Sequence, residues 1–383
     1  MNSPINLTFL VRSLDYGGAQ RQLVTLAKAL DQDRFDVTVI SFYSGQPLEK
    51  ELANSGVRFI SLEKRGRWDV LGFLRRLIHQ VRVIRPDVLH GYLDIPNLLA
   101  LFIKPFVHAR VVWGIRAAEI DLRQYDWLVW LAAQLERIFA RFADLIIVNS
   151  VAGFERHVSR GFPPRKMVVI PNGIDTDMFK PDREAGAKLR AEWLISEHTR
   201  LIGTVGRLDP MKDLPVFLQT AALLSLKRND VRFACVGPGP ASYVLKLQEL
   251  ANELGIADEV IWPGARADIS AVYNALDAFC SSSYGESFSN AIGEAMACGV
   301  PCVVTDVGDS ASIVGECGIV VPPRNPGALA AGLISSLEPN RSEIERNART
   351  RIVEHFSVQK MLKLTEESIL SLAKRSGCND NRC

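Results

Sequence analysis

The sequence predicts an α/β fold built from two doubly wound domains, each with its own parallel sheet. Short β-branched runs alternate with helical segments along nearly the whole chain, which is typical of a parallel sheet covered by helices on both faces. The alternation breaks at a turn-rich stretch, residues 171–188, and then restarts. At 383 residues the chain also exceeds what one hydrophobic core usually supports. We therefore expect two similar domains.

The expected strands follow one another in regular order. The first half contains seven, at residues 6–11, 36–42, 57–61, 87–90, 109–113, 145–149 and 167–171. The second half contains five, at residues 200–205, 231–236, 259–262, 278–281 and 301–305. We place the first domain at residues 1–178 and the second at residues 179–355. Residues 356–383 are expected to form an amphipathic helix that packs back on the first domain, followed by a frayed tail.

The composition narrows the class of protein. With 48% hydrophobic and 23% charged residues, the chain has the make-up of a soluble globular protein. No stretch approaches the ~18 apolar residues of a membrane span, and the first residues lack a signal peptide, so we expect a cytoplasmic location. The seven cysteines form neither a disulfide framework nor a metal tetrad, so no metal is expected.

The small net charge of +2 hides an asymmetry between the two halves. Residues 1–180 hold 24 basic and 18 acidic side chains, whereas the remaining residues hold 21 and 25. We expect the basic half to meet an anionic partner, either an acceptor or the inner face of the membrane, and not nucleic acid. A basic helix that follows residues 64–68 suits a membrane interface, although a packing helix with a solvated basic face explains it equally well.

The most informative stretch is residues 284–301, in which two glutamates bracket a loop and the helix after it. We expect Ser289 to cap this helix and Gly299 to end it. A helix start presents unpaired N–H groups and a partial positive charge, which suits a diphosphate. Glu286 is placed to accept hydrogen bonds from the hydroxyls of a sugar, and Glu294 to hold the two hydroxyls of a ribose.

This spacing, with the trailing Glu-Ala-Met-Ala-Cys-Gly-Val-Pro, resembles the signature of the retaining glycosyltransferases of family four, the group 1 enzymes. The resemblance covers essentially the whole chain. It implies the GT-B fold, in which two Rossmann-like domains face each other across a cleft. It also implies transfer of a hexosyl unit from a UDP- or GDP-sugar to a glycan or lipid-linked acceptor, in polysaccharide or glycolipid biosynthesis. No cofactor is implied, and the base and the sugar stay open.

The resemblance extends to three more loops after expected strands. Residues 206–214 are similar to the family's diphosphate-binding loop, in which Arg207 and Lys212 would stabilise the departing nucleoside diphosphate without a metal. The loop at residues 263–266 would border the nucleobase, although Arg266 has Asp268 as an alternative partner. The glycine pair after the first strand resembles the loop that borders donor and acceptor. The donor-binding set is Gly17, Gly18, Gly206, Arg207, Lys212, Gly264, Arg266, Glu286, Ser287, Phe288, Ser289, Asn290 and Glu294.

The clearest departure from the family lies in the loop at residues 111–119. Many members carry a histidine there that touches the donor sugar, whereas this chain has Arg116. The predicted catalytic set is therefore Glu286, Arg207, Lys212 and Arg116. His90, Tyr92 and Glu119 are secondary candidates for contacting the acceptor or the sugar. A histidine at a strand end is otherwise a structural residue whose hydrogen bonds are satisfied.

Two alternatives stay open. A nucleotide-sugar epimerase has the same fold, but it needs acid and base groups in the first domain, and no clear pair is present. A catalytically inactive subunit that binds sugar nucleotides would explain the missing histidine. The sequence shows no carboxylate pair of the glycosidase type. We therefore expect the leaving group to depart and the acceptor to attack on the same face, assisted by the leaving phosphate.

Overall fold

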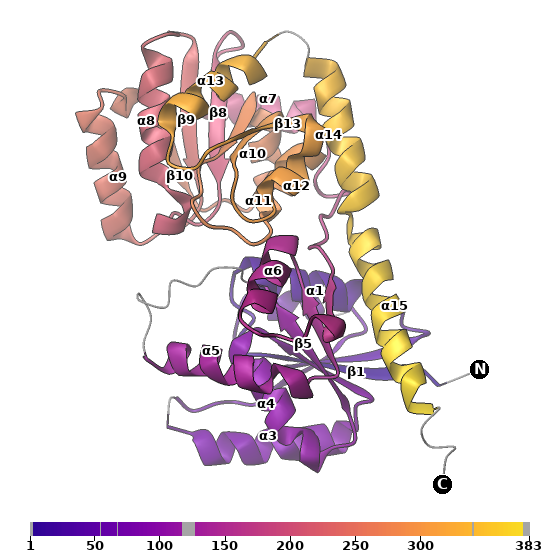
Figure 1. The fold of residues 1–383 in the computed structure, drawn as a ribbon. Helices are drawn as coiled ribbons and strands as arrows, with labels where there is room; N and C mark the ends of the chain where they lie inside the picture. The colour runs from indigo at the N-terminus through magenta and orange to yellow at the C-terminus, as the bar shows by residue number, and fades with distance from the viewer. Residues whose placement is uncertain (1–2, 54, 67, 117–126, 339–340, 378–383) are drawn as a thin grey trace. The chain divides into compact units, whose positions relative to one another are not determined.

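The computed structural model describes residues 3–53, 55–66, 68–116, 127–338 and 341–377. The chain divides into two compact units (Figure 1). Unit 1 comprises Met1–Gly173 and Val358–Cys383, and unit 2 comprises Ile174–Ser357. Each unit has its own parallel sheet with helices on both faces, which confirms the two-sheet α/β fold. By contacts, the chain changes unit at residue 173, whereas the turn signals had placed the domain boundary at residue 178.

Unit 1 contains a seven-stranded parallel sheet in the order β3-β2-β1-β4-β5-β6-β7. The strands are β1 (Ile5–Val11), β2 (Phe35–Ser41), β3 (Arg58–Ser61), β4 (Val88–Tyr92), β5 (Arg110–Ile115), β6 (Leu145–Val148) and β7 (Met167–Val169). All seven coincide with strands expected from β-branched runs. The strand order reverses between β1 and β4, and in such sheets ligands collect beyond the carboxyl ends near this reversal.

The helices of unit 1 cover both faces of its sheet. They are α1 (Gly18–Ala29), α2 (Glu49–Leu52), α3 (Val70–Ile84), α4 (Asp94–Ile103), α5 (Trp127–Phe139), α6 (Val151–Ser159) and α15 (Val358–Gly377). Short 3-10 turns are η1 (Lys104–Phe106), η3 (Ala140–Phe142) and η4 (Pro164–Lys166). The core on one face includes Phe9 and side chains from α1 and α15. The core on the other face includes Trp113 and side chains from α3 and α4. The terminal helix α15 therefore belongs to the core of unit 1.

Unit 2 contains a six-stranded parallel sheet in the order β10-β9-β8-β11-β12-β13. The strands are β8 (Arg200–Val205), β9 (Val231–Val236), β10 (Val260–Gly264), β11 (Ala278–Ser281), β12 (Cys302–Thr305) and β13 (Gly318–Val321). Five of them were expected, and β13 was missed. This edge strand begins with Gly318 and lies directly before Pro322 and Pro323, and both glycine and proline are depleted in strands.

The helices of unit 2 also lie on both faces of its sheet. They are α7 (Arg183–Glu192), α8 (Leu214–Ser225), α9 (Ala241–Glu253), α10 (Ile269–Ala275), α11 (Asn290–Ala297), α12 (Ser310–Val314), α13 (Pro326–Ser336) and α14 (Arg341–His355). The 3-10 turns are η5 (Pro210–Lys212), η6 (Ala257–Glu259) and η7 (Gly315–Cys317). In the part of the chain that the structure describes, no helix is long and apolar enough to span a bilayer.

Candidate functional site

The predicted donor loops of unit 2 all follow the carboxyl ends of strands. The β8–α8 loop carries Arg207 and Lys212, the loop after β10 carries Arg266, and the β11–α11 loop carries Glu286. Because the sheet is parallel, these loops emerge at the same edge. We call this edge of unit 2 the donor edge.

Two glycines allow the backbones of neighbouring loops to touch at the donor edge. A Cβ added to Gly237 would lie 1.8 Å from the carbonyl oxygen of Gly206, and the φ of Gly237 is +142°. Gly206 has a φ of +148°, and its N–H donates to the carbonyl of Val236 over 2.9 Å. Glycine is therefore required at Gly206, at the start of the loop that carries Arg207, and at Gly237 in the neighbouring loop.

Lys212 and Glu286 form the centre of the site. The Lys212 ammonium lies 2.5 Å from Oε1 of Glu286, and the hydroxyl of Ser283 donates to the same oxygen over 2.9 Å. The Glu286 side chain is only 10% exposed. Its second oxygen, Oε2, makes no hydrogen bond with any described residue, so it is available to accept one from a ligand hydroxyl.

Hydrogen bonds hold the loops of Lys212 and Glu286 against each other. The Tyr284 N–H donates to the carbonyl of Met211 over 3.0 Å, and the Ser282 hydroxyl donates to the carbonyl of Lys212 over 2.8 Å. Below them, the hydroxyl of Thr305 on β12 donates to the carbonyl of Ser283 over 2.6 Å. The separation of the two charged side chains is therefore set by backbone contacts.

The helix after Glu286 begins as expected, but without the predicted cap. Ser289 occupies the N-cap position of α11, yet its hydroxyl accepts no capping hydrogen bond, so the capping prediction is wrong. Phe288 is buried in the core of unit 2, with its ring 5.6 Å from that of Phe356. Only the backbone of Phe288 is therefore placed to contact a ligand.

Glu294 has a fixed orientation one helical turn further on. The Tyr273 hydroxyl donates to Oε2 of Glu294 over 2.8 Å, and the Tyr273 ring is fully buried. Burial, reinforced by the Glu294 charge, raises the pKa of Tyr273 well above its usual value, so the phenol stays a donor. Ser287 and Asn290 lie on either side of Phe288 and Ser289, partly exposed at the start of the helix.

Arg207 and Arg266, the other two predicted cations of the donor edge, differ in how exposed they are and in how many carboxylates they contact. The Arg207 side chain is 71% exposed, and one guanidinium nitrogen lies 2.9 Å from a carboxylate oxygen of Asp209. Arg266 donates to Asp268 over 2.7 Å and to Glu192 over 2.7 Å. Both carboxylates raise the pKa of Arg266. Two carboxylates thus neutralise the charge of Arg266. The part of this loop that is placed to contact the edge of a nucleobase is its backbone, including Gly264, which has a φ of +70°.

In unit 1, Arg116 is a buried cation at the carboxyl end of β5. Its guanidinium donates to Oδ1 of Asn172 over 3.1 Å and lies 4.7 Å from the centroid of the Tyr92 ring. Only 9% of the residue is exposed, and its Nε has no partner among the described residues. A buried arginine with a free donor suits an anionic or hydroxyl-rich ligand.

His90 and Tyr92 lie beneath this arginine. Both side chains are fully buried, and neither the His90 ring nitrogens nor the Tyr92 hydroxyl has a partner among the described residues. Burial, with a smaller contribution from Arg116, lowers the pKa of His90 to about 3. The expectation that the hydrogen bonds of His90 are satisfied is therefore wrong. The ring is neutral at physiological pH and packs against Phe9 at 5.1 Å.

The first glycine pair lies where α1 begins. Gly17 precedes α1 with an extended backbone, and an added Cβ would meet only the flexible end of Gln20. Gly18 is the first residue of the helix. Backbone geometry therefore does not require glycine at Gly17. The secondary candidate Glu119 lies outside the described residues.

A second set of buried polar residues in unit 1 escaped the sequence analysis. Asn97 accepts from the N–H of Gly114 over 3.1 Å and donates to Oε1 of Glu136 over 3.3 Å. Burial and the neighbouring Asp94 raise the pKa of Glu136 to about 8. Leu93, directly before Asp94, has a φ of +72°. Nothing in the amphipathic sequence around Glu136 distinguishes it from a solvent-facing glutamate.

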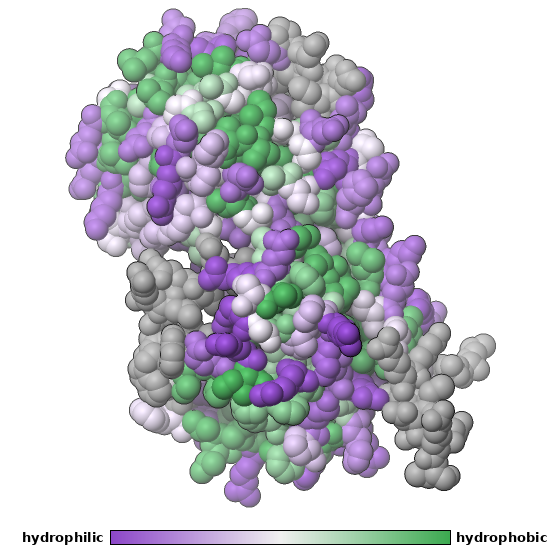
Figure 2. Space-filling model, viewed as in Figure 1, coloured by the Kyte–Doolittle hydropathy of each residue, from purple (hydrophilic) through white to green (hydrophobic). Residues whose placement is uncertain are grey.

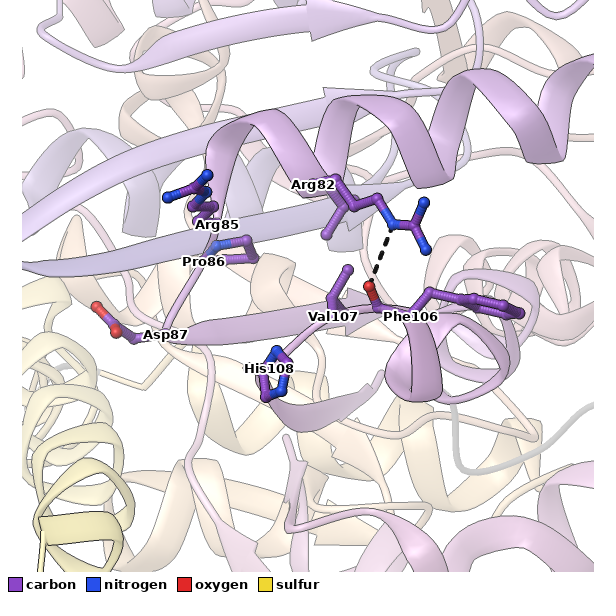
Figure 3. A pocket seen from close by; sticks show the side chains of 8 residues that line it. Arg82, Arg85, Pro86, Asp87, Phe106, Val107 and His108 are labelled. Atoms are coloured by element: carbon purple, nitrogen blue, oxygen red, sulfur yellow. Dashed lines mark hydrogen bonds between the residues drawn. The ribbon is translucent and has the colours of Figure 1, made fainter. Parts of the chain in front are cut away.

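A hollow of about 500 Å³ lies at the opposite edge of the unit 1 sheet, before β4 and β5 (Figure 3). Arg82 and Arg85 line one side of it, at the end of α3, and Val107 and His108 line the other; Arg82 donates to the carbonyl of Phe106 over 3.3 Å. No predicted site residue lines it. Among the described residues, no group of three or more His, Cys, Asp or Glu is arranged to hold a metal ion.

Two family models match this chain. A family model described as "Glycosyltransferase Family 4" matches residues 16–178, and one described as "Glycosyl transferases group 1" matches residues 199–338. A D-inositol 3-phosphate glycosyltransferase of Thermobispora bispora is 32% identical over 280 residues, which cover 67% of this chain and 64% of that protein. The protein of the same name from Mycobacterium sp. (strain JLS) is 35% identical over 222 residues, 56% of this chain and 48% of the relative. The matched part of the chain thus spans 48% and 64% of the length of these two relatives.

Solved structures share the fold. Anabaena HepE, solved in complex with UDP-glucose, superposes with a TM-score of 0.84 at 22% identity and covers 96% of this chain and 100% of its own. WaaG, a glycosyltransferase involved in lipopolysaccharide biosynthesis, gives a TM-score of 0.71 at 18% identity and covers 94% of this chain and 98% of its own. At these identities the likeness establishes the arrangement of the chain and nothing further.

Proposed function

We propose that this chain, which belongs to the group 1 glycosyltransferases of family four and has their GT-B fold, transfers a hexosyl unit from a nucleotide sugar to a glycan or lipid-linked acceptor. The transfer is proposed to proceed with retention and without a metal ion. The observation that carries this proposal is the pairing of Lys212 with one oxygen of Glu286, beside the start of α11.

The donor edge has the groups that such a reaction needs. A departing nucleoside diphosphate gains negative charge as the bond to the sugar breaks, and the Lys212 ammonium and the exposed Arg207 fork are cations that stabilise it. Oε2 of Glu286 would accept a hydroxyl of the sugar, and Glu294, oriented by Tyr273, would accept the ribose hydroxyls. These roles use each carboxylate as a hydrogen-bond acceptor.

The donor is proposed to be a UDP- or GDP-sugar. HepE was solved with UDP-glucose, which makes that molecule the first donor to test. Relatives named D-inositol 3-phosphate glycosyltransferase act on a phosphate-bearing acceptor, as their name states. The buried Arg116 guanidinium is suited to such an anionic acceptor, or to the transferred sugar.

The acceptor is proposed to be met at the inner face of a membrane, through an exposed aromatic surface of unit 1. This surface consists of Phe102, Phe106 and Phe142, each about half exposed, and of two arginines that lie over aromatic rings. Arg82 lies 5.8 Å from the ring of Phe106, and Arg141 lies 5.5 Å from that of Phe142. In the region of α3, Figure 2 shows hydrophobic residues interspersed with hydrophilic ones. Such mixtures are typical of interfacial binding.

A donor screen tests the reaction. The purified protein is incubated with UDP-, GDP- and ADP-sugars, and free nucleoside diphosphate and sugar isomers are measured. Slow release of nucleoside diphosphate from one donor supports a transferase, whereas isomer formation supports an epimerase of the same fold. Binding without turnover, with acceptors supplied, supports an inactive binding subunit. If Glu286→Ala and Lys212→Ala both leave turnover unchanged, the site assignment is wrong.

Sedimentation with vesicles tests the membrane surface. The double variant Arg82→Gln and Arg141→Gln should bind phosphatidylglycerol vesicles more weakly than the wild type does, because both cations of the surface are removed. The exposed Arg183 and Lys188 of unit 2 provide a control of equal charge, and the double variant Arg183→Gln and Lys188→Gln should bind as the wild type does. Equal binding by all three proteins would remove the basis for this part of the proposal.

A further inference from the structure

A third loop, absent from the sequence predictions, reaches the pair formed by Lys212 and Glu286. Arg324 lies between β13 and α13, and its guanidinium carbon stands 5.0 Å from the centroid of the Tyr284 ring. The positive charge also faces the Asp213 carboxylate. Burial raises the pKa of Asp213, and the attraction to Arg324 is the largest effect that opposes this rise. Tyr284 lies two residues before Glu286, and Asp213 follows Lys212 directly, so Arg324 contacts one loop of the pair and its charge attracts the other.

The backbone of Arg324 is unusual for a residue with a side chain. Its φ is +57°, in the left-handed region that glycine adopts freely and that other residues adopt at a steric cost. The side chain is exposed, and it forms no hydrogen bond or ion pair with the residues that the structure describes. Neither burial nor a salt bridge offsets the strain. Its remaining interactions are the stacking on Tyr284 and the attraction to Asp213.

The stacking on Tyr284 and the attraction to Asp213 add to hydrogen bonds that already hold the loops of Lys212 and Glu286 together. The Tyr284 N–H donates to the carbonyl of Met211, and the neighbouring Ser282 hydroxyl donates to the carbonyl of Lys212. A cation over the Tyr284 ring restrains that side chain, and with it the segment between Ser282 and Glu286. Loss of the cation would leave this segment held by its hydrogen bonds alone.

We propose that Arg324 is a positioning residue for the transfer reaction, which holds the loop of Lys212 against the loop of Glu286 through Tyr284 and Asp213. The inference rests on the proposed function, because it concerns the alignment of the same two side chains. The contact between the loops can nevertheless be measured without turnover. The experiment therefore combines a structural readout with a kinetic one.

The test compares three substitutions of Arg324 with a control at Leu194. Arg324→Gln removes the charge and keeps a polar side chain, and Arg324→Lys keeps the charge. Arg324→Gly removes the side chain and also the strain of the backbone at a positive φ. Leu194 has the same φ of +57°, its side chain is 91% exposed, and it lies before β8, at the end of the sheet away from the donor edge. Leu194→Gly therefore removes the same backbone strain at a position away from the two loops.

Amide hydrogen exchange at Tyr284, kcat and KM for the donor, and the affinity for UDP are measured for each protein. Arg324→Gln and Arg324→Gly should exchange the Tyr284 amide about two- to fivefold faster, which corresponds to the loss of one exposed cation–π contact. Their kcat should fall about tenfold while KM changes less, because small misplacements act mainly on the reacting geometry. Arg324→Lys should stay within about threefold of the wild type, and Leu194→Gly should match it.

Two results would overturn the inference. The first is unchanged exchange at Tyr284 in Arg324→Gln, which would show that the cation does not hold the loop. The second is faster exchange with unchanged kcat, which would show that the contact does not serve the reaction. If the wild type turns over no donor, the proposed function fails on its own. The inference is then decided by the exchange rates and by whether Arg324→Gln weakens UDP binding more than Leu194→Gly does.

Discussion

His90 should make unit 1 sensitive to acid, and replacing it should remove part of that sensitivity. The buried imidazole has a pKa of about 3, against an unfolded-state value of about 6.5. Because the folded value is the lower one, the unfolded chain binds the proton first as the pH falls. The stability associated with the neutral ring is therefore complete above about pH 6.5, and it is lost progressively between about pH 6.5 and about pH 3.

The expected size follows from linkage. Between pH 7 and pH 5, a histidine that titrates near 6.5 when unfolded and stays neutral when folded lowers the free energy of unfolding by about 1.9 kcal/mol. This figure barely depends on the folded value, because at pH 5 the buried ring is still neutral for any pKa below about 4. His157 should contribute a similar loss, since burial lowers its pKa to about 4.

The assay is urea unfolding at pH 7, 6 and 5, followed by tryptophan fluorescence. Unit 1 holds four of the six tryptophans, so the signal reports mainly on this unit. His90→Phe should lose about 1.9 kcal/mol less than the wild type between pH 7 and pH 5. His108→Gln, at an exposed position of the same unit, should lose as much as the wild type does. If His90→Phe and the wild type lose stability in parallel, the imidazole is not buried in its neutral form and the reasoning fails.

Three further predictions concern unit 2. Glu286→Gln should lower kcat/KM about 10²- to 10³-fold in the donor assay, because it keeps the shape of the side chain but removes the charge that pairs with Lys212; the same loss of the ion pair should also lower thermal stability. Gly237→Ala should lower the free energy of unfolding of unit 2 by about 3 kcal/mol in urea unfolding. The new methyl group would lie 1.8 Å from the carbonyl oxygen of Gly206, and Gly237 has a positive φ that alanine adopts at a cost. A loss below about 1 kcal/mol would contradict this. Asp277→Asn should lower the free energy of unfolding by about 3 kcal/mol in the same measurement, because it leaves two partly buried arginines without their carboxylate. That carboxylate is only 12% exposed and lies 2.9 Å from Arg190 and 3.1 Å from Arg200. Equal stability of the variant and the wild type at pH 7 would contradict this.

The strands were predictable because each depends on its own sequence. Runs such as the one at β2 are rich in β-branched residues, and turns bound them, so no distant contact is needed to identify them. The strand β13 shows the limit of this reasoning. Its four residues pair with β12 along one edge only, and the partner is what makes them a strand. The loops of the donor edge were located for the same reason as the strands, since each follows one directly.

The directions of side chains in those loops were not predictable. Phe288 faces the core because Phe356, 68 residues later in the chain, provides the surface that covers it. Arg266 is balanced by Glu192 as well as by the neighbouring Asp268, and only the fold brings Glu192 close. The raised pKa of Glu136 likewise arises from burial, which a helical pattern of polar and apolar residues does not report.

The side chains around Arg116 constrain how the acceptor proton can leave. An arginine stays protonated at any physiological pH, so Arg116 cannot take a proton where a histidine could. His90 lies directly below but is buried, and with a pKa of about 3 it is a weak base. If the proposed transfer takes place at this edge of unit 1, neither residue is a suitable general base. The pH dependence of kcat should therefore show no limb from Arg116 or His90.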